Sequence, residues 1–522
     1  MATRYGSLIE AFIEQARGAW ARPAVSDTTG KNLTYGKTLT GAVLLAGLIN
    51  RAASGENYIG VLLPPSAAGV VANLAVTLSG RVAVNLNYTL PPQAFRSAMD
   101  QCRIKHVLTS RRMIERFGGL PMPESVIFLE DEIARFTRMD RMKAALKARF
   151  LPSGSLVPQN AHAGSPAAVI FSSGSTGDPK GVVLSNGNLL SNVKGIQATI
   201  RTQPSDSICA VLPFFHCLGY TGTFWFPLLA GFKAVYHTSP LDTATVVETI
   251  RENRCTMLLA TPTFLLNYMK KARAQDFSSL RLVITGAERL KKEVAGAFEA
   301  RFGVRPLEGY GATELSPVVS LNAPDNPGAV NHKEGTVGRP LPGISIKIVS
   351  PESGEPLPTG QHGIIKVKGP NVMTGYLNKP GETMRVIEDG WYDTGDIGFM
   401  DEDGFLTITD RLSRFSKIAG EMVPHLAIED DLHNRLEIEQ ALAVVSMHDA
   451  KGERLLVVYT SGAVDADRLS MAIAESRLPN LWKPGRKSLL PVESLPVLGS
   501  GKLDIRGLKE LALKMLDNSR EP

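Results

Sequence analysis

Short apolar runs rich in β-branched residues alternate with longer stretches of helical spacing in residues 58–110, and this alternation most limits the folds open to the chain. The stretch begins YIGVLLPPSAAGVVANLAVTLSGRVAVNLNY, and the same rhythm returns at SICAVLP, FKAVYHT, CTMLLATP and LRLVITGAE. Apolar runs separated by helices are typical of buried parallel strands in βαβ units. The sequence therefore predicts an α/β fold that contains two α/β subdomains.

The pattern changes after Gly335, where short strands broken by Gly and Pro predict a small β-rich subdomain. A boundary near Arg411 separates a large first part from a final segment in which helix and strand patterns mix. A chain of 522 residues is long enough for two or more domains. We therefore expect an N-terminal domain over residues 1–411 and a small α+β C-terminal domain over residues 412–522.

Composition excludes several classes of protein. Apolar residues make up 43% of the chain and charged residues 21%, which argues against disorder and against a membrane-embedded protein. The first helix pattern carries Glu10 and Glu14 where a secretory signal would need an unbroken apolar core. No uninterrupted apolar run approaches the ~20 residues needed to span a bilayer, which predicts a soluble protein. The four cysteines show no metal-ligand spacing and are too few to staple a chain of this length, which predicts the reducing cytoplasm. The net charge of +6 is too modest to indicate nucleic acid as a partner.

Residues 133–150, IARFTRMDRMKAALKARF, form a basic amphipathic helix pattern. Large apolar residues recur at steps of three and four: Ile133, Phe136, Met139, Met142, Leu146 and Phe150. Basic residues occupy much of the rest: Arg135, Arg138, Arg141, Lys143, Lys147 and Arg149. Two interpretations stay open, namely contact with an anionic membrane surface and a solvated helix packed on its own domain.

The segment FSSGSTGDPKG follows a predicted buried strand at residues 167–171 and has the composition of a phosphate-binding loop. Its glycines allow a close backbone approach, while N–H groups, hydroxyls and an ammonium suit a polyphosphate. It is not the usual P-loop, G-x-x-x-x-G-K-[ST], because Pro179 precedes the lysine. The predicted ligand-binding residues are Ser172, Ser173, Gly174, Ser175, Thr176, Gly177 and Lys180.

This loop resembles that of the adenylate-forming superfamily, which includes acyl-CoA synthetases, peptide-synthetase adenylation domains and firefly luciferase. Four further segments resemble motifs of the superfamily in the same order along the chain: GYGATELSP, GWYDTGD, DRLSRFSKIAGEMV and GSGKLD. The resemblance implies ATP and Mg²⁺ as cofactors. It also implies that an acyl-adenylate forms with release of pyrophosphate, and that the acyl group then passes to a thiol.

The resemblance also implies roles for individual residues. Tyr310 would stack on adenine, Thr313 would contact the α-phosphate, and Glu314 would bind Mg²⁺. Asp396 would accept the ribose hydroxyls, and Arg411 would donate to the sugar or the phosphate, although an ordinary surface ion pair is the alternative. The residues implied to line adenine and the acyl chain are Gly286, Ala287 and Glu288, while Gly309 and Gly311 beside Tyr310 let the ligand approach.

In the superfamily a mobile C-terminal domain acts twice. Lys502 in GSGKLD is implied to stabilise the charge that gathers on the phosphate oxygens during adenylation. The domain then rotates about a hinge, which position assigns to Ser413, although many relatives carry Asp or Lys there. Lys417 matches the face that acts in the thioester-forming step. In PFFHCLGYTG, His216 corresponds to a residue that orients the carboxylate beside the acyl pocket.

Within the superfamily, EGYGATELSPVVSLN, TDRLSRFSKIAGEMVPH and LPNLWKPGR most closely resemble the acyl-ACP synthetase half of bifunctional 2-acylglycerophosphoethanolamine acyltransferase/acyl-ACP synthetases. This implies a fatty acid substrate and holo-acyl carrier protein as the thiol acceptor. Long-chain acyl-CoA synthetases share many of these motifs, so coenzyme A stays open as the acceptor. The acyltransferase half has no counterpart in the sequence, so lysophospholipid acylation would need a separate acyltransferase.

Three further points remain open. Basic residues cluster in ESRLPNLWKPGRK, which suits an acidic carrier protein or the phosphates of coenzyme A, but a solvated positive face fits equally well. An amino-acid-activating ligase is disfavoured because PFFHCLGY offers no acidic partner for an ammonium group. A non-catalytic acyl-nucleotide sensor is the alternative from another class, and absent ATP–pyrophosphate exchange would support it.

Overall fold

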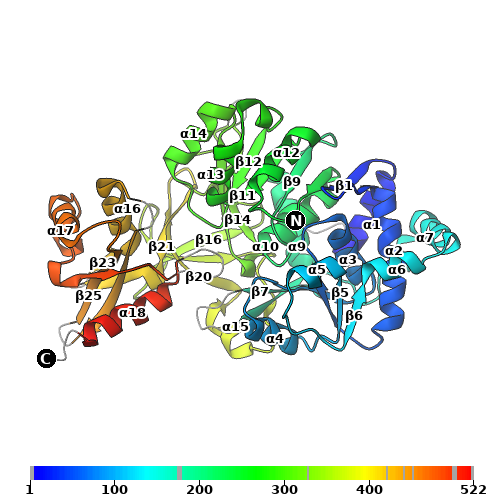
Figure 1. Ribbon diagram of the computed structural model, residues 1–522, viewed down its shortest axis with the longest axis horizontal. Helices are drawn as coiled ribbons and strands as arrows, with labels where there is room; N and C mark the ends of the chain where they lie inside the picture. Colours follow the sequence, from blue (N-terminus) through cyan, green and yellow to red (C-terminus); the bar gives the residue numbers. More distant parts are fainter. Residues whose placement is uncertain are drawn as a thin grey trace. The chain divides into compact units, whose positions relative to one another are not determined.

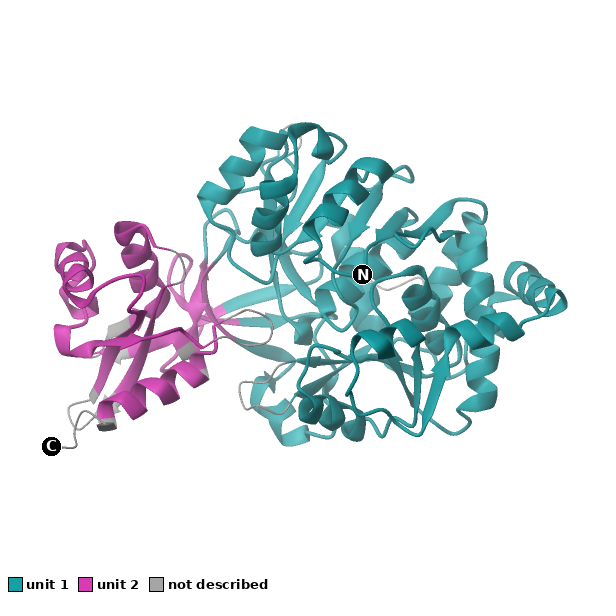
Figure 2. Cartoon of the chain, viewed as in Figure 1, with its two compact units in different colours: residues 1–347, 366–394, 400–407 teal, residues 348–365, 395–399, 408–522 magenta. Residues whose placement is uncertain are grey.

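The computed structural model describes residues 5–172, 179–325, 329–418, 421–438, 441–449, 452–496 and 503–518 (Figure 1). The chain forms two compact units (Figure 2). Unit 1 consists of residues 1–347, 366–394 and 400–407, and unit 2 of residues 348–365, 395–399 and 408–522. Unit 2 therefore includes short segments that precede residue 412.

Unit 1 contains a sheet of nine strands in the order β15-β14-β13-β12-β11-β9-β10-β1-β2. The five central strands from β13 to β10 pair in parallel, as does β1 with β10, whereas β2, β14 and β15 pair antiparallel. The strands are β1 Pro23–Asp27, β2 Asn32–Thr34, β9 Ser207–Ala210, β10 Lys233–Tyr236, β11 Met257–Ala260, β12 Leu282–Thr285, β13 Pro306–Gly311, β14 Val318–Leu321 and β15 Arg339–Pro340.

A second sheet of unit 1 has seven strands in the order β18-β8-β7-β4-β3-β5-β6. Strands β7, β4, β3, β5 and β6 run parallel, and β8 and β18 are added antiparallel at one edge. The strands are β3 Tyr58–Leu62, β4 Val82–Asn85, β5 His106–Thr109, β6 Ser125–Phe128, β7 Pro166–Ser172, β8 Lys180–Ser185 and β18 Gly375–Tyr376. Two mainly parallel sheets confirm the α/β fold that the alternating pattern predicts.

Local capping explains where many of the helices of unit 1 begin. Ser7, Thr34, Ser66 and Thr261 each accept a backbone N–H at the start of a helix, which satisfies a donor that has no partner within the helix. The principal helices are α1 Leu8–Gly18, α2 Tyr35–Ala52, α3 Ala67–Leu78, α4 Pro92–Gln101, α5 Arg111–Arg116, α6 Leu129–Arg135, α7 Arg138–Phe150, α9 Asn186–Thr199, α12 Thr243–Asn253, α13 Pro262–Lys271, α14 Lys292–Phe302 and α15 Pro380–Val386.

The basic pattern of residues 133–150 forms two helices rather than the single helix predicted. Thr137 has extended backbone angles and separates α6 from α7. Its side chain accepts the Asp140 N–H, and the Asp140 carboxylate accepts from the Thr137 N–H at 3.0 Å, which completes a capping box. Apolar periodicity continued through this point, but the capping residues interrupt the helix.

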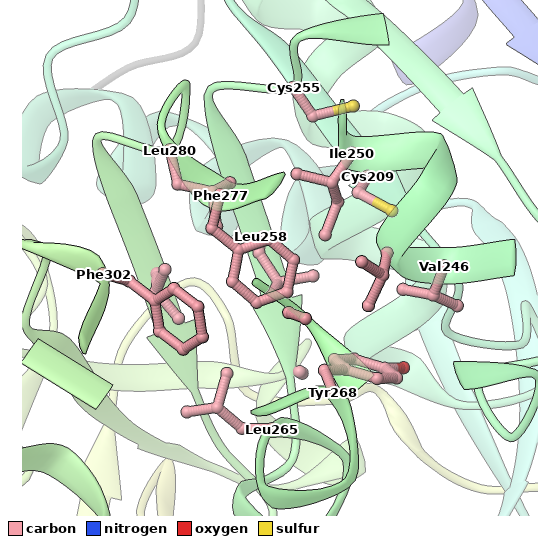
Figure 3. Packing of buried hydrophobic residues seen from close by; sticks show 14 of the residues in the cluster. Cys209, Val246, Ile250, Cys255, Leu258, Leu265, Tyr268, Phe277, Leu280 and Phe302 are labelled. Atoms are coloured by element: carbon pink, nitrogen blue, oxygen red, sulfur yellow. The ribbon is translucent and has the colours of Figure 1, made fainter. Parts of the chain in front are cut away.

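Aromatic and aliphatic side chains fill the space between the nine-stranded sheet and helices α12, α13 and α14 (Figure 3). Phe277, Phe298 and Phe302 pack together, with ring centroids 4.7–5.9 Å apart. Cys209 and Cys255 are buried in the same cluster as free thiols. This core fixes one face of the parallel strands, so their carboxyl ends are held in place.

In unit 2, the sheet β24-β25-β26 is buried on both faces. Alternate residues of β24 and β25 enter two different cores, Val444 and Val457 on one face and Val445 and Val458 on the other. Helices α16 and α17 supply residues to the first core, and α18 to the second. The elements are β22 Phe415–Ile418, β23 Glu421–Pro424, α16 His425–Leu436, β24 Leu442–Asp449, β25 Gly452–Thr460, α17 Ala466–Glu475, β26 Leu489–Val492 and α18 Ile505–Asn518.

A small sheet follows in the region where the sequence predicts a β-rich subdomain. Its order is β16-β17-β20-β19, and β21 pairs with β20. Strands β16, β17, β20 and β21 each contribute residues to both units. The strands are β16 Ser345–Val349, β17 Gly363–Lys368, β19 Ile387–Glu388, β20 Trp391–Met400 and β21 Leu406–Arg411.

Candidate active site

The predicted phosphate loop connects two antiparallel strands. Ser172 ends β7 and Lys180 begins β8, and the two residues are paired across the ladder. In a P-loop the glycine-rich segment leads from a strand into a helix. Here the chain returns along the same sheet, which agrees with the absence of the P-loop spacing from the sequence.

Lys180 has an anionic partner on α15. Its Nζ lies 2.6 Å from Glu382 Oε2 and 5.2 Å from the centroid of the Tyr376 ring. Lys379 lies 3.4 Å from the other oxygen of the same carboxylate. Lys180, as the main cause, lowers the pKa of the Glu382 carboxyl. A phosphate that binds Lys180 would therefore compete with a carboxylate that is already in contact with the ammonium.

The GYGATE motif forms the end of β13 and a short 3₁₀ turn, Thr313–Leu315. A Cβ atom at Gly311 would lie 1.8 Å from the Pro317 carbonyl oxygen, so only glycine fits there. Side chains from distant segments hold the turn. Thr221 donates to the Ser316 carbonyl at 2.8 Å, and Asn371 donates to the Leu315 carbonyl at 2.9 Å.

Glu314 is held by both its side chain and its backbone. The Tyr376 hydroxyl donates to Glu314 Oε1 at 2.9 Å, and the Met373 N–H donates to the Glu314 carbonyl at 2.8 Å. Burial and then the Glu314 carboxylate raise the pKa values of Tyr376 and of its neighbour Tyr392. Both phenols are therefore protonated at neutral pH, and Tyr376 acts as a hydrogen-bond donor.

His216 lies at the start of a buried aromatic segment. Its side chain is exposed, and its ring centroid is 4.8 Å from that of Phe215. The segment continues through a π-helix, Tyr220–Trp225, whose residues are all buried. Burial and, to a smaller extent, the Glu314 carboxylate raise the pKa of the Cys217 thiol, which places the residue after His216 within the field of Glu314.

The predicted adenine loop follows β12. A Cβ atom at Gly286 would lie 3.6 Å from the Gly309 carbonyl oxygen and 3.6 Å from Leu218 Cδ2, so the loop lies beside β13 and the aromatic segment. Ala287 has a positive φ of 69°. Glu288 accepts the Thr263 hydroxyl at 2.6 Å and the Thr263 N–H at 3.2 Å, so its carboxylate contacts the first turn of α13.

These contacts bring several predicted residues of unit 1 together. Tyr376 contacts both Lys180 and Glu314, while Gly286 lies next to Gly309 and close to the segment of His216. Gly286 follows β12, and Gly309 lies near the end of β13, at the carboxyl edge of the parallel strands. Ligands of open α/β sheets bind at this edge.

Asp396 and Arg411 belong to unit 2 and contact each other. Arg411 Nε lies 3.2 Å from Asp396 Oδ1. Asp396 is buried, whereas the Arg411 side chain is 75% exposed. A buried carboxylate beside an exposed guanidinium is compatible both with a ribose-binding pair and with an ordinary ion pair.

Several predicted residues cannot be placed in the site. Residues 173–177 and Lys502 lie outside the described residues. For Ser413, in the turn Leu412–Arg414, and for Lys417, in β22, the structure describes the backbone alone. Their implied roles therefore stay predictions.

Four side chains that lie near these residues are not predicted from the sequence: Tyr376, Tyr392, Glu382 and Glu308. Burial raises the pKa of the Glu308 carboxyl to about 7, and the Leu290 N–H donates to Glu308 Oε1 at 3.0 Å. Tyr392 lies within the motif GWYDTGD and Glu308 next to GYGATE, so the positions of these two residues carried a signal. Glu382 lies on a helix without such a motif.

No group of three or more metal-ligating side chains occurs within the part of the chain that the structure describes. Glu314 is a carboxylate held in place by Tyr376 without such a cluster around it. Mg²⁺ is commonly bound by one or two carboxylates together with substrate phosphates. The donor set therefore fits a Mg²⁺ ion that arrives with a nucleotide.

Comparison with known proteins gives a family and several relatives. The pattern that defines the family described as AMP-binding enzyme matches residues 12–377. The long-chain-fatty-acid–CoA ligase of Bacillus subtilis (strain 168) is 28% identical over 520 residues, which cover 92% of this chain and 90% of that protein. The probable 4-coumarate–CoA ligase 3 of Dictyostelium discoideum is 36% identical over 355 residues, which cover 66% of this chain and 63% of that protein.

Solved structures share the fold over nearly the full length of the chain. ATP-bound MatB of Rhodopseudomonas palustris superimposes with a TM-score of 0.80 at 25% identity, covering 96% of this chain and 98% of that one. The o-succinylbenzoate–CoA synthetase MenE of Bacillus subtilis, in complex with ATP and a magnesium ion, gives a TM-score of 0.79 at 22% identity, with 96% and 99% covered.

Proposed function

The chain belongs to the AMP-binding enzyme family and is an AMP-forming acid–thiol ligase, and we propose that it joins a fatty acid to the phosphopantetheine thiol of an acyl carrier protein. In the first step the carboxylate oxygen attacks the α-phosphorus of ATP and pyrophosphate leaves. In the second step the thiol sulfur attacks the carbonyl carbon of the acyl-adenylate, and AMP leaves while the thiol proton is released.

The arrangement around Tyr376 is the observation that carries the adenylation step of the proposal. This side chain contacts Lys180 on one side and donates to Glu314 on the other, so a cation and a carboxylate lie on either side of it. We propose that Glu314 would hold Mg²⁺, which when bound would neutralise charge on the nucleotide phosphates. Thr313 would contact the α-phosphate, and Lys180 would bind the polyphosphate together with Ser172 and residues 173–177.

The remaining roles are proposed from the motifs and their positions. Tyr310 would stack on adenine, with Gly309 and Gly311 allowing its close approach, and Gly286, Ala287 and Glu288 would line adenine and the acyl chain. Asp396 and Arg411, which contact each other, would bind the ribose. His216, whose side chain is exposed, would orient the acyl carboxylate.

A C-terminal domain of residues 412–522 would act in both steps. We propose that it presents Lys502 during adenylation and then turns about Ser413 to present the face that carries Lys417. An ammonium placed at the α-phosphate stabilises charge that develops in the transition state. Reuse of one domain for two steps requires a hinge of a few residues.

The acyl carrier protein is proposed from the branch of the superfamily that the sequence resembles. Arg477, Arg486 and Lys487 are exposed, which suits an acidic partner, although Arg486 also contacts Asp467. Coenzyme A is the second candidate acceptor, because the Bacillus subtilis relative is a CoA ligase by name. A carrier-bound acyl product would then be consumed by a separate acyltransferase.

A competition experiment tests the acid and the acceptor together. The purified protein would receive ATP, Mg²⁺, fatty acids of several chain lengths and 4-coumaric acid, with holo-acyl carrier protein and coenzyme A both present. Mass spectrometry of the thioesters is expected to show fatty acyl groups on the carrier protein. Acyl-CoA alone would contradict the proposed acceptor, and coumaroyl thioester alone would contradict the proposed acid.

We also propose that the enzyme works in the cytoplasm. Its four cysteines are buried free thiols, as a reducing compartment favours. Across the described residues, each helix is too short or too polar to cross a bilayer. Fractionation of the cells that produce the protein tests the location, and recovery from an oxidising compartment would contradict it.

A further inference from the structure

Helix α7 turns its small residues toward unit 1 and its large apolar residues toward solvent. Ala144 and Ala148 are buried, and α7 packs against α2 (Figure 1). With about 100° between successive residues, the stripe formed by Met139, Met142, Leu146 and Phe150 lies on the side of the helix opposite the two alanines. The usual surface helix has the reverse arrangement, with its apolar stripe facing the core.

The exposure of this apolar stripe is large for every member. Met139 and Met142 are each 58% exposed, Leu146 is 52% exposed and Phe150 is 74% exposed. Ile133 on the preceding helix is 55% exposed. Single exposed apolar residues need no explanation, but large apolar residues gathered on one helix face mark a surface that binds a partner.

The position of α7 does not depend on the apolar stripe. Its first turn is closed by the capping box of Thr137 and Asp140. At its other end, Arg17 Nε donates to the Ala148 carbonyl at 2.9 Å, and Arg17 also donates to the Leu151 carbonyl. Thus α7 is fixed on unit 1 by its C-terminal end and by its alanine face, while the apolar stripe is left to contact something else.

Positive charge borders the apolar stripe on both sides. The helical spacing puts Lys143 and Lys147 on one flank and Arg138 on the other, and all three residues are exposed. The only acidic residue of α7 is Asp140, whose carboxylate is used in the capping box. Phospholipid headgroups of an anionic bilayer complement this charge, while acyl chains accommodate Met, Leu and Phe side chains.

We infer that the apolar stripe and its basic borders dock the protein on an anionic membrane surface, with α7 lying in the plane of the interface. This inference concerns a surface separate from the residues proposed to bind ATP, so it does not depend on the acyl acceptor. The binding combines burial of apolar side chains with attraction between Lys or Arg and anionic lipid. It is therefore expected to be reversible and to weaken as salt concentration rises.

Vesicle flotation of the full chain provides the test. Vesicles would contain phosphatidylcholine alone or an equimolar mixture of phosphatidylcholine and phosphatidylglycerol. The wild-type protein is expected to float with the anionic vesicles and to do so less at high salt. A double variant, Leu146→Glu with Phe150→Glu, is expected to bind them at least about tenfold more weakly, because both changes remove apolar contact and add negative charge.

Matched variants separate the docking surface from general effects. Leu241→Glu alters a residue of unit 1 that is 74% exposed, as Phe150 is, but that lies outside α7, and it should leave flotation unchanged. A triple variant, Arg138→Gln with Lys143→Gln and Lys147→Gln, should lower binding to anionic vesicles and reduce its salt dependence. All of these residues are exposed, so the thermal unfolding temperatures should match that of the wild type.

Three outcomes would overturn the inference. One is wild-type protein that does not float with anionic vesicles at low salt. A second is equal loss of binding in the Leu241→Glu control. The third is a wild-type dimer that the double variant converts to monomers, as measured by light scattering, because the apolar stripe would then be covered by a second copy of the chain.

Discussion

At the scale of single residues, the contact between Tyr376 and Glu314 joins positions 62 residues apart in the sequence. The GYGATE motif predicts Glu314 as a metal ligand from local sequence alone. Its tyrosine partner was not predictable, because that contact depends on how β18 pairs with β8 and so brings Tyr376 to the turn. Local motifs therefore indicate candidate ligand residues, but not the side chains that orient those residues.

Tyr376→Phe is expected to raise the KM for MgATP about tenfold, because the Glu314 carboxylate loses the hydroxyl that orients it. ATP–pyrophosphate exchange at varied Mg²⁺ concentration measures the effect, and excess Mg²⁺ should restore part of the rate. Tyr268→Phe is the matched control, since its hydroxyl donates to the Pro240 carbonyl at 2.9 Å, away from the motifs. An unchanged KM in Tyr376→Phe would show that the hydroxyl does not position Glu314.

Glu308→Gln is expected to alter how stability depends on pH. Burial raises the pKa of Glu308 to about 7 in the folded chain, above its ordinary value of 4.5. Between these values the folded state keeps a proton that the unfolded state has released, so stability falls as pH rises through this window. Thermal unfolding measured from about pH 5 to pH 8 should show that the stability of the variant rises relative to that of the wild type as pH increases. The exposed Glu355 supplies the control, Glu355→Gln, and an equal gain there would refute the assignment.

At the scale of elements, the sequence predicts one strand closely but misses the break between two helices. The β-strand expectation for residues 167–171 is close to the observed β7, Pro166–Ser172. The capping that divides α6 from α7 was missed, although Thr137 and Asp140 have the spacing of a capping box. Apolar periodicity gives the type of an element more reliably than it gives its ends.

Gly311→Ala is expected to destabilise unit 1 and to abolish adenylation, because the new methyl group would overlap the Pro317 carbonyl oxygen at 1.8 Å. Gly296→Ala is the matched control, since Gly296 lies within α14 and has open space around it. This control should gain about 0.5–1 kcal/mol from its higher helix propensity. Denaturant unfolding and pyrophosphate exchange measure both effects, and normal exchange in Gly311→Ala would contradict the geometry.

The element that follows the proposed hinge is tied to the body of unit 2. Arg414 donates to Glu429 Oε1, and the same oxygen accepts the Val444 N–H at 2.6 Å. Burial raises the pKa of Glu429, and Arg414 opposes that rise. If Ser413 is the hinge, the next residue, Arg414, is already fixed to α16 through Glu429, and Glu429 also bonds β24.

Arg414→Met is expected to cost about 3–5 kcal/mol, because it leaves the buried Glu429 carboxylate without its cation. The double variant Arg414→Met with Glu429→Gln should recover part of this loss, since no unpaired charge remains. Hydrogen exchange of the β24 amides in the full chain measures local opening of unit 2. If the losses of stability caused by Arg414→Met and Glu429→Gln were additive, the two residues would not be a coupled pair.

At the scale of the whole molecule, the alternating pattern predicts the α/β class. The sequence does not predict which chain segments make up unit 2. Residues 348–365 and 395–399 join unit 2 through a small core of Val349, Ile364 and Ile397, against which Phe415 packs. These residues are distant in sequence, and no local pattern predicts that they meet. Strand order in the nine-stranded sheet likewise depends on long-range pairing.

A comparison of Lys502→Ala and Lys417→Ala tests whether one domain serves both steps. Lys502→Ala is expected to lower pyrophosphate exchange by about 10²–10³-fold, because it removes transition-state charge stabilisation. Lys417→Ala should retain exchange but slow thioester formation from preformed acyl-adenylate in a single turnover. If both variants lost adenylation and thioester formation equally, the two lysines would not act in separate steps.

The apolar stripe of α7 would affect how the enzyme encounters its fatty acid substrate. A long-chain fatty acid partitions into lipid, so an enzyme held on the bilayer encounters it by diffusion in two dimensions. The turnover rate would then follow the mole fraction of fatty acid in the surface rather than its total concentration in the assay. Adding inert lipid would dilute the substrate for the docked enzyme and slow it, whereas a variant released into bulk solvent would respond to the small dissolved pool.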